Sequence, residues 1–375
     1  MEPRVARFAP AACSRLVVKI GSALLVDGDG KVRRDWLAGV LDDLVERHRA
    51  GQGIVIVSSG AIALGARRLG LPKGGRASLE DAQAAAATGQ IALSQVYAEL
   101  LHERGLTAAQ MLVTLDDLED RRRFLNASAT LERLLSLGVV PVLNENDSVA
   151  TAEIRFGDND RLAARVAQAA GAGGVLLLSD VDGLYTANPA SDPNATFIET
   201  VEKLDARIEA MADARSASGL GSGGMVAKLQ AAKIANAAGA HLAILSGKVD
   251  HPLARFAETG RGTVFVASGG ARAKKAWLAG RLTAKGRLSI DAGAAKALRD
   301  GRSLLAAGVT AVAGRFERGD VIEVWTDDGA VARGLAAYSN DEAARLAGTR
   351  NDAQEVILGY APRSAMIHRD HLVLL

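Results

Sequence analysis

The chain has little cysteine and proline, and it lacks any long apolar run. Its 375 residues include one cysteine, Cys13, and eight prolines. A single cysteine excludes an internal disulfide framework and is typical of a reducing compartment. No segment approaches eighteen consecutive apolar residues, and Met1–Ala12 carries arginines without an apolar core, so neither a membrane span nor a secretory signal is predicted. We therefore expect a cytoplasmic protein.

Three common ligand-binding patterns are also missing. The six histidines lie outside every motif and show no metal-ligand spacing. Gly219, Gly221 and Gly224 have the spacing of a dinucleotide site, but residues 205–215 before them are predicted to form a helix rather than the required strand. Gly247-Lys248 lacks the earlier glycine and the hydroxyl residue of a P-loop. The sequence therefore predicts no nicotinamide site, no P-loop and no protein-built metal site.

Glycine is abundant, with 40 residues, and it falls where helices end. Apolar strand-like runs alternate with helical stretches, which predicts an α/β fold with a mainly parallel open sheet and helices on both faces. Such sheets bind ligands at the carboxyl ends of their strands. Strands are expected at 16–20, 54–58, 139–143, 175–179 and 242–245, and helices near 35–50, 61–69, 79–104, 122–137, 159–170 and 225–238, with C-cap glycines at Gly51, Gly105, Gly138, Gly171 and Gly239.

The alternating pattern ends near residue 266, and a chain of this length exceeds one ordinary core. Short strand-like runs follow, such as 321–325 and 331–337 around an Asp-Asp-Gly turn. We expect an N-terminal tail at 1–11, a catalytic domain at 12–268, a linker at 269–278 and a small β-barrel domain at 279–375. The net charge of +2 and the mild basic excess of the last domain do not demand a nucleic-acid partner.

Two polar clusters follow the strand expected at 139–143. They are Asn144-Glu145-Asn146-Asp147 and Gly157-Asp158-Asn159-Asp160. Together with Glu153, their carboxylates repel one another unless an ammonium, a lysine or a metal lies among them. An acidic surface loop is the alternative interpretation.

Two further segments supply positive charge and anion-binding backbone. A lysine within the apolar run Leu16–Ile20 is costly to bury, so Lys19 is expected to reach out at the end of the strand, beside Gly21 and Ser22. Ser59 and Gly60 lie at the start of a predicted helix, where a carboxylate or phosphate binds favourably. A serine nucleophile is the alternative there, but the Gly-x-Ser-x-Gly pattern is absent.

A third segment is the glycine loop that opens the helix predicted from Met225. Lys228 lies one turn inside this helix, and helical side chains lean toward the N-terminus, so its ammonium is expected to reach the loop. A solvated surface lysine is the alternative.

Taken in order, these motifs resemble the amino-acid kinase family, and within it the members that phosphorylate the γ-carboxylate of glutamate. The resemblance runs from about Arg15 to the C-terminus, and residues 286–333 resemble a PUA domain. Arg161 departs from the smaller polar residue common at its position, while Ser22 and Ser179 keep a hydroxyl where threonine is also common. The motifs are residues 17–22, 57–62, 144–150, 156–160, 178–185 and 221–228.

The resemblance implies a role for each site residue. The expected catalytic residues are Lys19, Lys228 and Asp160, with Asp160 orienting the two lysines. The expected ATP-binding residues are Lys19, Gly21, Ser22, Ser179, Asp180, Ser222, Gly223, Gly224, Met225 and Lys228. The expected glutamate-binding residues are Ser59, Gly60, Ala61, Asn144, Asp147, Asp158 and Asn159.

The expected reaction is ATP-dependent phosphorylation of L-glutamate, the first step of proline biosynthesis. Magnesium is expected to bind through the ATP phosphates. The resemblance also implies feedback inhibition by proline, hand-over of the product to glutamyl phosphate reductase, and a homo-oligomer. Kinases of acetylglutamate, aspartate, carbamate or uridylate remain alternatives within the fold, and RNA binding through the C-terminal domain is an alternative of another class.

Overall fold

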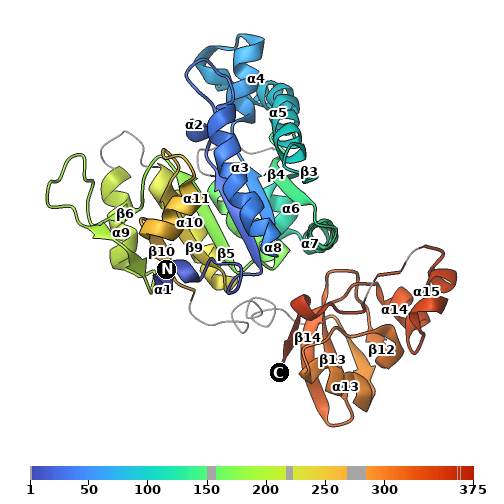
Figure 1. The fold of residues 1–375 in the computed structure, drawn as a ribbon. Helices are drawn as coiled ribbons and strands as arrows, with labels where there is room; N and C mark the ends of the chain where they lie inside the picture. Colours follow the sequence, from blue (N-terminus) through green and yellow to red (C-terminus); the bar gives the residue numbers. More distant parts are fainter. Residues whose placement is uncertain (1, 150–157, 217–222, 268–283, 361, 364) are drawn as a thin grey trace. The chain divides into compact units, whose positions relative to one another are not determined.

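The computed structural model describes residues 2–149, 158–216, 223–267, 284–360, 362–363 and 365–375 (Figure 1). The chain forms two compact units. The first comprises Met1–Glu119 with Ala127–Gly269, and the second comprises Asp120–Asn126 with Gly270–Leu375. The sequence pattern predicts one helix near residues 122–137 and does not show that Asp120–Asn126 belongs to a different unit from the residues after it.

The first unit contains an eight-stranded sheet in the order β3-β4-β2-β1-β5-β9-β10-β8. The six strands from β3 to β9 are parallel, and β10 runs antiparallel to β9. The prediction of a mainly parallel sheet is confirmed. The strands are β1 (Arg15–Ile20), β2 (Gly53–Ser58), β3 (Ala108–Val113), β4 (Val140–Glu145), β5 (Gly174–Ser179), β8 (Thr200–Val201), β9 (His241–Ser246) and β10 (Thr263–Phe265), and a separate hairpin pairs β6 (Leu184–Tyr185) with β7 (Phe197–Ile198).

Helices cover both faces of this sheet. Leu16, Val18 and Ile20 of β1 belong to a core shared with helices on one face. Because strand side chains alternate, Lys19 points to the opposite face. The helices of the first unit are α1 (Pro3–Ala6), α2 (Ser22–Leu25), α3 (Arg34–Arg49), α4 (Ala61–Leu69), α5 (Leu79–His102), α6 (Leu115–Glu119), α7 (Arg121–Ser136), α8 (Asp158–Ala170), α9 (Ala206–Ser216), α10 (Gly223–Ala237) and α11 (Pro252–Thr259), with a short 3-10 turn η1 (Pro72–Gly75), and α7 begins within the second unit.

The helix ends follow the local sequence signals. Ser78 caps α5, since its side chain accepts a hydrogen bond from the Asp81 amide at 3.1 Å. The five glycines predicted to end helices all have positive φ, from 63° at Gly171 to 85° at Gly51, a conformation that glycine adopts without steric cost.

Helices α4 and α5 cross at very short range. A Cβ atom at Gly65 would overlap the carbonyl of Ala85, and one at Gly89 would overlap the carbonyl of Ala61. Only glycine at both positions allows this approach. The crossing sets where the first residue of α4 and the middle of α5 lie relative to each other.

The second unit is built on a five-stranded sheet in the order β12-β11-β13-β14-β15. Its separate core includes Leu288, Val324 and Ile367. Ser339 and Glu342 form a capping box at the start of α14. Its elements are β11 (Gly286–Ile290), α13 (Ala292–Arg299), η2 (Ala306–Gly308), β12 (Val309–Gly314), β13 (Val321–Thr326), β14 (Gly329–Leu335), α14 (Asn340–Leu346), α15 (Asn351–Leu358), η3 (Arg369–His371) and β15 (Leu372–Leu374).

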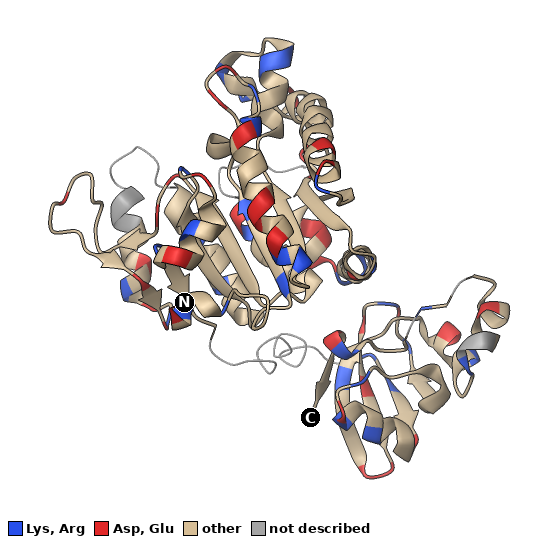
Figure 2. Ribbon diagram, in the orientation of Figure 1, with Lys and Arg blue, Asp and Glu red and all other residues tan. Residues whose placement is uncertain are grey.

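Basic and acidic residues are interspersed on the helices of both units, in keeping with the net charge of +2 (Figure 2). Among the described residues, no helix combines the length and the apolar character that crossing a membrane requires.

Candidate active site

Four of the six motifs singled out in the sequence follow the carboxyl ends of four neighbouring parallel strands, and the other two contain the first residues of α8 and α10. These strands lie in the order β4, β2, β1, β5. Parallel pairing brings their carboxyl ends to one edge of the sheet. Asn144 and Glu145 end β4, Ser58 ends β2, Ile20 ends β1 and Ser179 ends β5.

Asp160 lies between two lysines. Its Oδ1 is 2.6 Å from Lys19 Nζ, and its Oδ2 accepts a hydrogen bond from Lys228 Nζ at 2.9 Å. Asp160 is 1% exposed and each lysine 8% exposed, so Lys228 is not the solvated surface lysine of the alternative interpretation. The carboxylate holds two ammonium groups side by side that would otherwise repel each other.

The two lysines keep Asp160 ionised. Burial alone would raise the pKa of the Asp160 carboxyl, but the charges of Lys19 and Lys228 outweigh it and hold that pKa below its ordinary value. One carboxylate against two ammonium groups leaves a local excess of positive charge. Such a buried excess suits a polyanion.

Glycines lie beside both ammonium groups. The Cβ position of Gly21 is 3.7 Å from Lys19 Nζ, and that of Gly224 is 4.0 Å from Lys228 Nζ. Gly21 precedes α2, which Ser22 opens, and Gly223 opens α10. An anion could therefore approach the backbone and an ammonium together. Met225 of the same helix is buried, and Ser222 lies outside the described residues.

Ser179 and Asp180 follow the next strand along the sheet. Ser179 is buried and donates its hydroxyl proton to Asp180 Oδ1 at 3.1 Å. Its carbonyl accepts a hydrogen bond from the Gly247 amide at 2.7 Å. Asp180 itself is exposed, so its carboxylate is accessible to a ligand at this edge.

Ser59 and Asn159 meet across the site. The Asn159 amide donates from Nδ2 to Ser59 Oγ at 2.8 Å. Its Oδ1 is buried and has no hydrogen-bond partner. An unpaired buried acceptor is costly, so Asn159 Oδ1 marks a place for a donor such as an ammonium group. Gly60, with φ of 107°, is the N-cap of α4, and Ala61 is its first residue.

Asn144 is held from two sides. Its Nδ2 donates to Gln90 Oε1 at 2.7 Å, and its Oδ1 accepts from the Glu145 amide at 2.9 Å. Asn144 is 2% exposed and Asp147 is 7% exposed. Asp158 opens α8, but its side chain lies outside the described parts of the chain.

A protein cation, which the sequence reasoning missed, lies near Asp147. Partial burial lowers the pKa of the Arg76 guanidinium, and the charge of Asp147 opposes this shift. Arg76 directly follows η1, far from the acidic motifs in sequence. The positive charge expected among these carboxylates therefore includes the guanidinium of Arg76. Gln90 was also missed, because an amide inside an alanine-rich helix carries no local signal.

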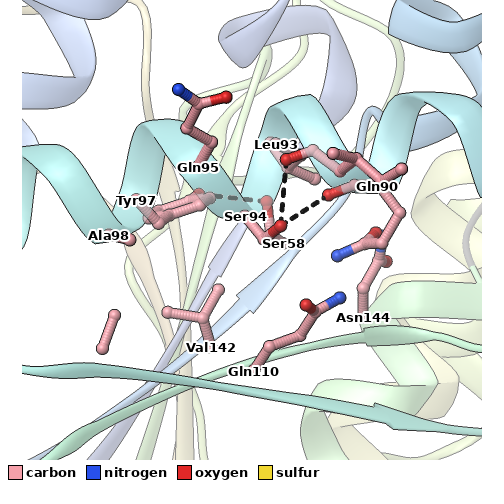
Figure 3. Close-up of a pocket in the computed structure, with 12 residues that line it drawn as sticks. Ser58, Gln90, Leu93, Ser94, Gln95, Tyr97, Ala98, Gln110, Val142 and Asn144 are labelled. Carbon is pink, nitrogen blue, oxygen red and sulfur yellow. Dashed lines mark hydrogen bonds between the residues drawn. The ribbon is translucent and has the colours of Figure 1, made fainter.

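A cavity of about 400 Å³ adjoins this region between α5 and strands β2, β3 and β4 (Figure 3). Its lining is mostly apolar, with the amides and hydroxyl of Gln90, Ser94, Gln110 and Asn144 among the polar groups. Tyr97 also lines the cavity and shares a 3.0 Å hydrogen bond with Ser58. Among the described residues no charged side chain lines the cavity, so it differs from the positive edge near Lys19.

The described residues contain no group of three or more His, Cys, Asp and Glu side chains placed to hold a metal ion.

Comparison with known proteins identifies relatives along most of the chain. The model of the amino acid kinase family matches residues 14–246, and that of the PUA domain matches residues 286–357. A glutamate 5-kinase of Sphingopyxis alaskensis is 71% identical over 98% of this chain and 99% of its own length. Those of Zymomonas mobilis and Novosphingobium aromaticivorans are 61% and 60% identical, over 98% and 97% of this chain and 93% and 97% of their own lengths.

Proposed function

The chain belongs to the amino acid kinase family, and from that premise we propose that it transfers the γ-phosphoryl group of ATP to the γ-carboxylate of L-glutamate, giving L-glutamyl 5-phosphate and ADP. The observation that carries the proposal is the buried arrangement of Lys19, Asp160 and Lys228 at the sheet edge. The glutamate 5-kinases that resemble the whole chain support glutamate as the acceptor.

The chemistry needs positioning and charge neutralisation rather than a base. The γ-carboxylate is already ionised at neutral pH, and one of its oxygens attacks the γ-phosphorus while the bond to the β-phosphate oxygen breaks. The reacting groups are both anionic and repel each other. Negative charge on the transferred group must therefore be stabilised during the reaction.

The two lysines supply this stabilisation in our proposal. Lys19 and Lys228 would contact oxygens of the β- and γ-phosphates, and Asp160 would keep their ammonium groups in place. Amides near Gly21, Ser22, Gly223 and Gly224 would donate to phosphate oxygens. Ser179 and Asp180 would contact the rest of the nucleotide. The resemblance to the family implies that Ser222 and Met225 also bind ATP.

Glutamate would bind on the other side of Asp160. The amides at Ser59, Gly60 and Ala61 would hold its α-carboxylate at the start of α4. Its α-ammonium would satisfy Asn159 Oδ1 and pair with Asp147. Asn144 and Asp158 complete the set by resemblance.

Magnesium fits this site as an ion carried by the substrate. It prefers oxygen ligands, keeps several waters and is commonly held through nucleotide phosphates. Asp160 is already paired with two lysines and is poorly suited to a metal as well. When bound, magnesium would add positive charge at the phosphates.

The further partners are proposals that rest on the resemblance. They are proline as a feedback inhibitor, a homo-oligomer, and a reductase that receives the labile acyl phosphate. We also propose that the protein acts in the cytoplasm, because its proposed substrates are ATP and glutamate.

The test is ADP formation with a panel of acceptors, namely L-glutamate, N-acetyl-L-glutamate, aspartate, carbamate and uridylate. We expect turnover with L-glutamate well above that with every other acceptor. Faster turnover with another acceptor would show that this acceptor, and not glutamate, is the substrate. No turnover with any of the five acceptors would refute the proposed kinase activity.

A further inference from the structure

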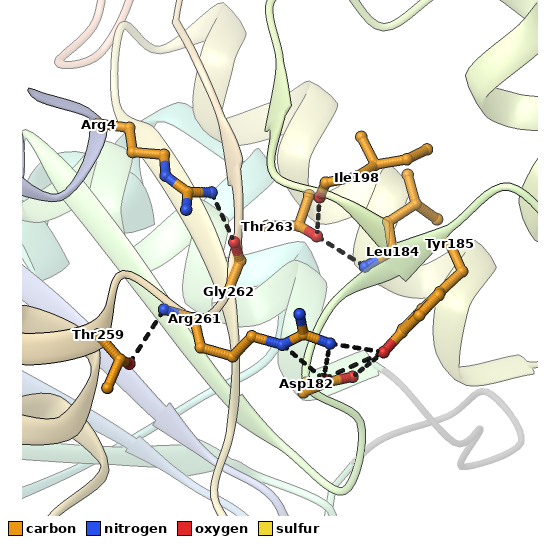
Figure 4. A network of polar contacts seen from close by, with 9 residues as sticks. All are labelled: Arg4, Asp182, Leu184, Tyr185, Ile198, Thr259, Arg261, Gly262 and Thr263. Atoms are coloured by element: carbon orange, nitrogen blue, oxygen red, sulfur yellow. Dashed lines mark hydrogen bonds and ion pairs between the residues drawn. The ribbon is translucent and has the colours of Figure 1, made fainter. Parts of the chain in front are cut away.

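A polar network holds the link between β5 and β6 against the far part of the sheet (Figure 4). Arg261, from the loop between α11 and β10, donates from Nε and Nη2 to Asp182 Oδ2 at 3.0 and 2.7 Å. Its Nη2 also donates to the Tyr185 hydroxyl oxygen at 2.8 Å. One guanidinium therefore holds residues on both sides of Gly183.

Arg261 is also stacked on an aromatic ring. Its Cζ lies 3.8 Å from the ring centroid of Phe197, and Phe197 meets Tyr185 edge to face at 5.3 Å. A planar guanidinium can stack on a ring and donate within its own plane at the same time, which an ammonium cannot do. The geometry of this position therefore requires arginine, and positive charge alone would not suffice.

The backbone of the same link is fixed from the other side. Thr263 Oγ1 accepts from the Leu184 amide at 2.7 Å and donates to the Ile198 carbonyl at 2.6 Å. A Cβ atom at Gly183 would fall 2.5 Å from Thr263 Oγ1, so no side chain fits there. The link between β5 and β6 is thus held by side-chain contacts and by backbone contacts.

Asp182 lies two residues after Asp180, which the proposed function assigns to the nucleotide. Resting on that assignment, we propose that Arg261 is a positioning residue for ATP, which acts through Asp182 on the backbone of Ser179 and Asp180. Among the described contacts, none joins this network to Lys19, Lys228 or Asn159. Arg261 therefore sets nucleotide affinity and leaves glutamate binding and the transfer step unchanged.

The test compares Arg261→Met, Arg261→Lys and Asp182→Asn in the full-length protein. Arg255→Met serves as the matched control, since Arg255 lies on the neighbouring α11 and its side chain, among the described residues, forms only an exposed pair with Glu258. The KM values for ATP and glutamate, kcat, and ATP affinity by calorimetric titration are measured, together with the melting temperature. The Arg261 and Asp182 side chains are 51% and 32% exposed, so a moderate effect is expected.

Arg261→Met should raise the KM and Kd for ATP about fivefold or more, at the lower end of coupling between sites. The glutamate KM and kcat should stay within about twofold, as should all values of the control. Arg261→Lys should restore little of the ATP affinity. The double variant Arg261→Met/Asp182→Asn should bind ATP no more weakly than the single variant with the larger effect, because both changes break the same interaction.

An unchanged ATP affinity in a folded Arg261→Met protein would overturn the proposal. So would a parallel rise in the glutamate KM, full rescue by lysine, or additive effects in the double variant. A wild-type protein that binds ATP but phosphorylates no glutamate would end the proposed function, and the titration would still test Arg261.

Discussion

At the residue scale, the central feature is a carboxylate that forms ion pairs with two lysines. Asp160 is buried between Lys19 and Lys228, and its lowered pKa keeps it ionised. A carboxyl whose pKa is lower in the folded than in the unfolded state stabilises the protein at pH values above its unfolded-state pKa. This stabilisation is lost as the pH falls through the folded-state pKa. Asp160 is therefore ionised throughout the neutral range in which the proposed reaction takes place.

Removal of Asp147 tests the glutamate site. Asp147→Ala should raise the glutamate KM about 10²-fold, since a hydrogen bond to a charged group contributes roughly 1.5–3 kcal/mol. Arg76, left without this carboxylate, would then repel the substrate ammonium. The ATP KM should stay near normal, and Asp116→Ala, an exposed carboxylate on α6, should change neither constant. An effect confined to ATP would contradict the role given to Asp147.

N-acetyl-L-glutamate tests the same group from the ligand side. Acetylation removes the positive charge that Asp147 and Asn159 Oδ1 would bind, and it adds bulk. Turnover of the acetylated acid should be at least about 10³-fold lower, because a buried carboxylate and an amide oxygen would both lose their partner. Comparable turnover of the two acids would show that the acidic cluster does not select the ammonium.

The sequence anticipated these residues unevenly. Lys19 lies near a predicted strand end and Lys228 follows a glycine loop, so the sequence pattern indicated both, whereas the pairing of Asp160 with the two lysines was expected from the resemblance to the family. Arg76 and Gln90 lie in segments without such a signal and reach the site only through the α4–α5 arrangement. Their part in the site depends on tertiary packing, which local patterns do not encode.

At the element scale, the crossing of α4 and α5 positions two parts of the glutamate site. Ala61 opens α4, and Gln90, next to Gly89 on α5, holds Asn144. The boundaries of α4 agree with prediction, and those of the central strands agree closely because their apolar runs are continuous. Strand β3 was not predicted, since it lies at the sheet edge with alternate residues exposed and lacks such a run.

Gly89→Ala tests this crossing. The added methyl group would overlap the carbonyl of Ala61, so we expect the free energy of unfolding to fall by about 3 kcal/mol, at the upper end of overpacking costs. The glutamate KM should rise more than the ATP KM. Gly28→Ala, where a Cβ atom meets nothing within 4 Å, is the control and should match the wild type in urea unfolding. Equal stability of the two variants would refute the tight crossing.

Helix α11 is joined to α3 by a hydrogen bond between His251 and Asp43. Asp43 hydrogen-bonds His251 at 2.9 Å and raises its pKa, assisted by the charges of Asp42 and Asp250 and opposed by slight burial. Since the folded-state pKa is the higher one, the stabilisation is complete below the unfolded-state value and is lost as pH rises through the folded-state pKa.

The melting temperature of wild type should therefore fall more than that of His251→Gln between about pH 6 and pH 8.5. Glutamine keeps a donor for Asp43 without a charge, so the two proteins should converge at the high end of this range. Parallel curves for wild type and variant would show that His251 contributes nothing through its charge.

At the scale of the whole molecule, two separate cores suggest that catalysis needs only one of them. The sheet and every described residue of the candidate site lie in the first unit. The change of pattern near residue 266 predicts a second domain from the sequence. The assignment of Asp120–Asn126 to the second unit was not readable, because helix periodicity is the same on either side of the boundary.

A chain that ends at Gly270 should fold and keep phosphoryl transfer, with kcat within about threefold of the full-length value, since domains commonly fold alone. Its melting temperature should fall, because Asp120–Asn126 loses the rest of its unit. The proposed homo-oligomer and the proposed proline response are both expected to change with the truncation. A soluble but inactive product would show that the second unit takes part in catalysis.

The most direct test of the account is the trapping of the acyl phosphate with hydroxylamine. Wild-type protein given ATP and L-glutamate should yield the γ-glutamyl hydroxamate. Lys228→Ala should lower the rate of its formation by about 10²-fold or more, with a much smaller change in KM, as for loss of one preorganised charge donor. Lys233→Ala, on the same helix but paired with Glu209 at the surface, should match the wild type. No hydroxamate from L-glutamate, or near-normal formation by Lys228→Ala, would contradict the account.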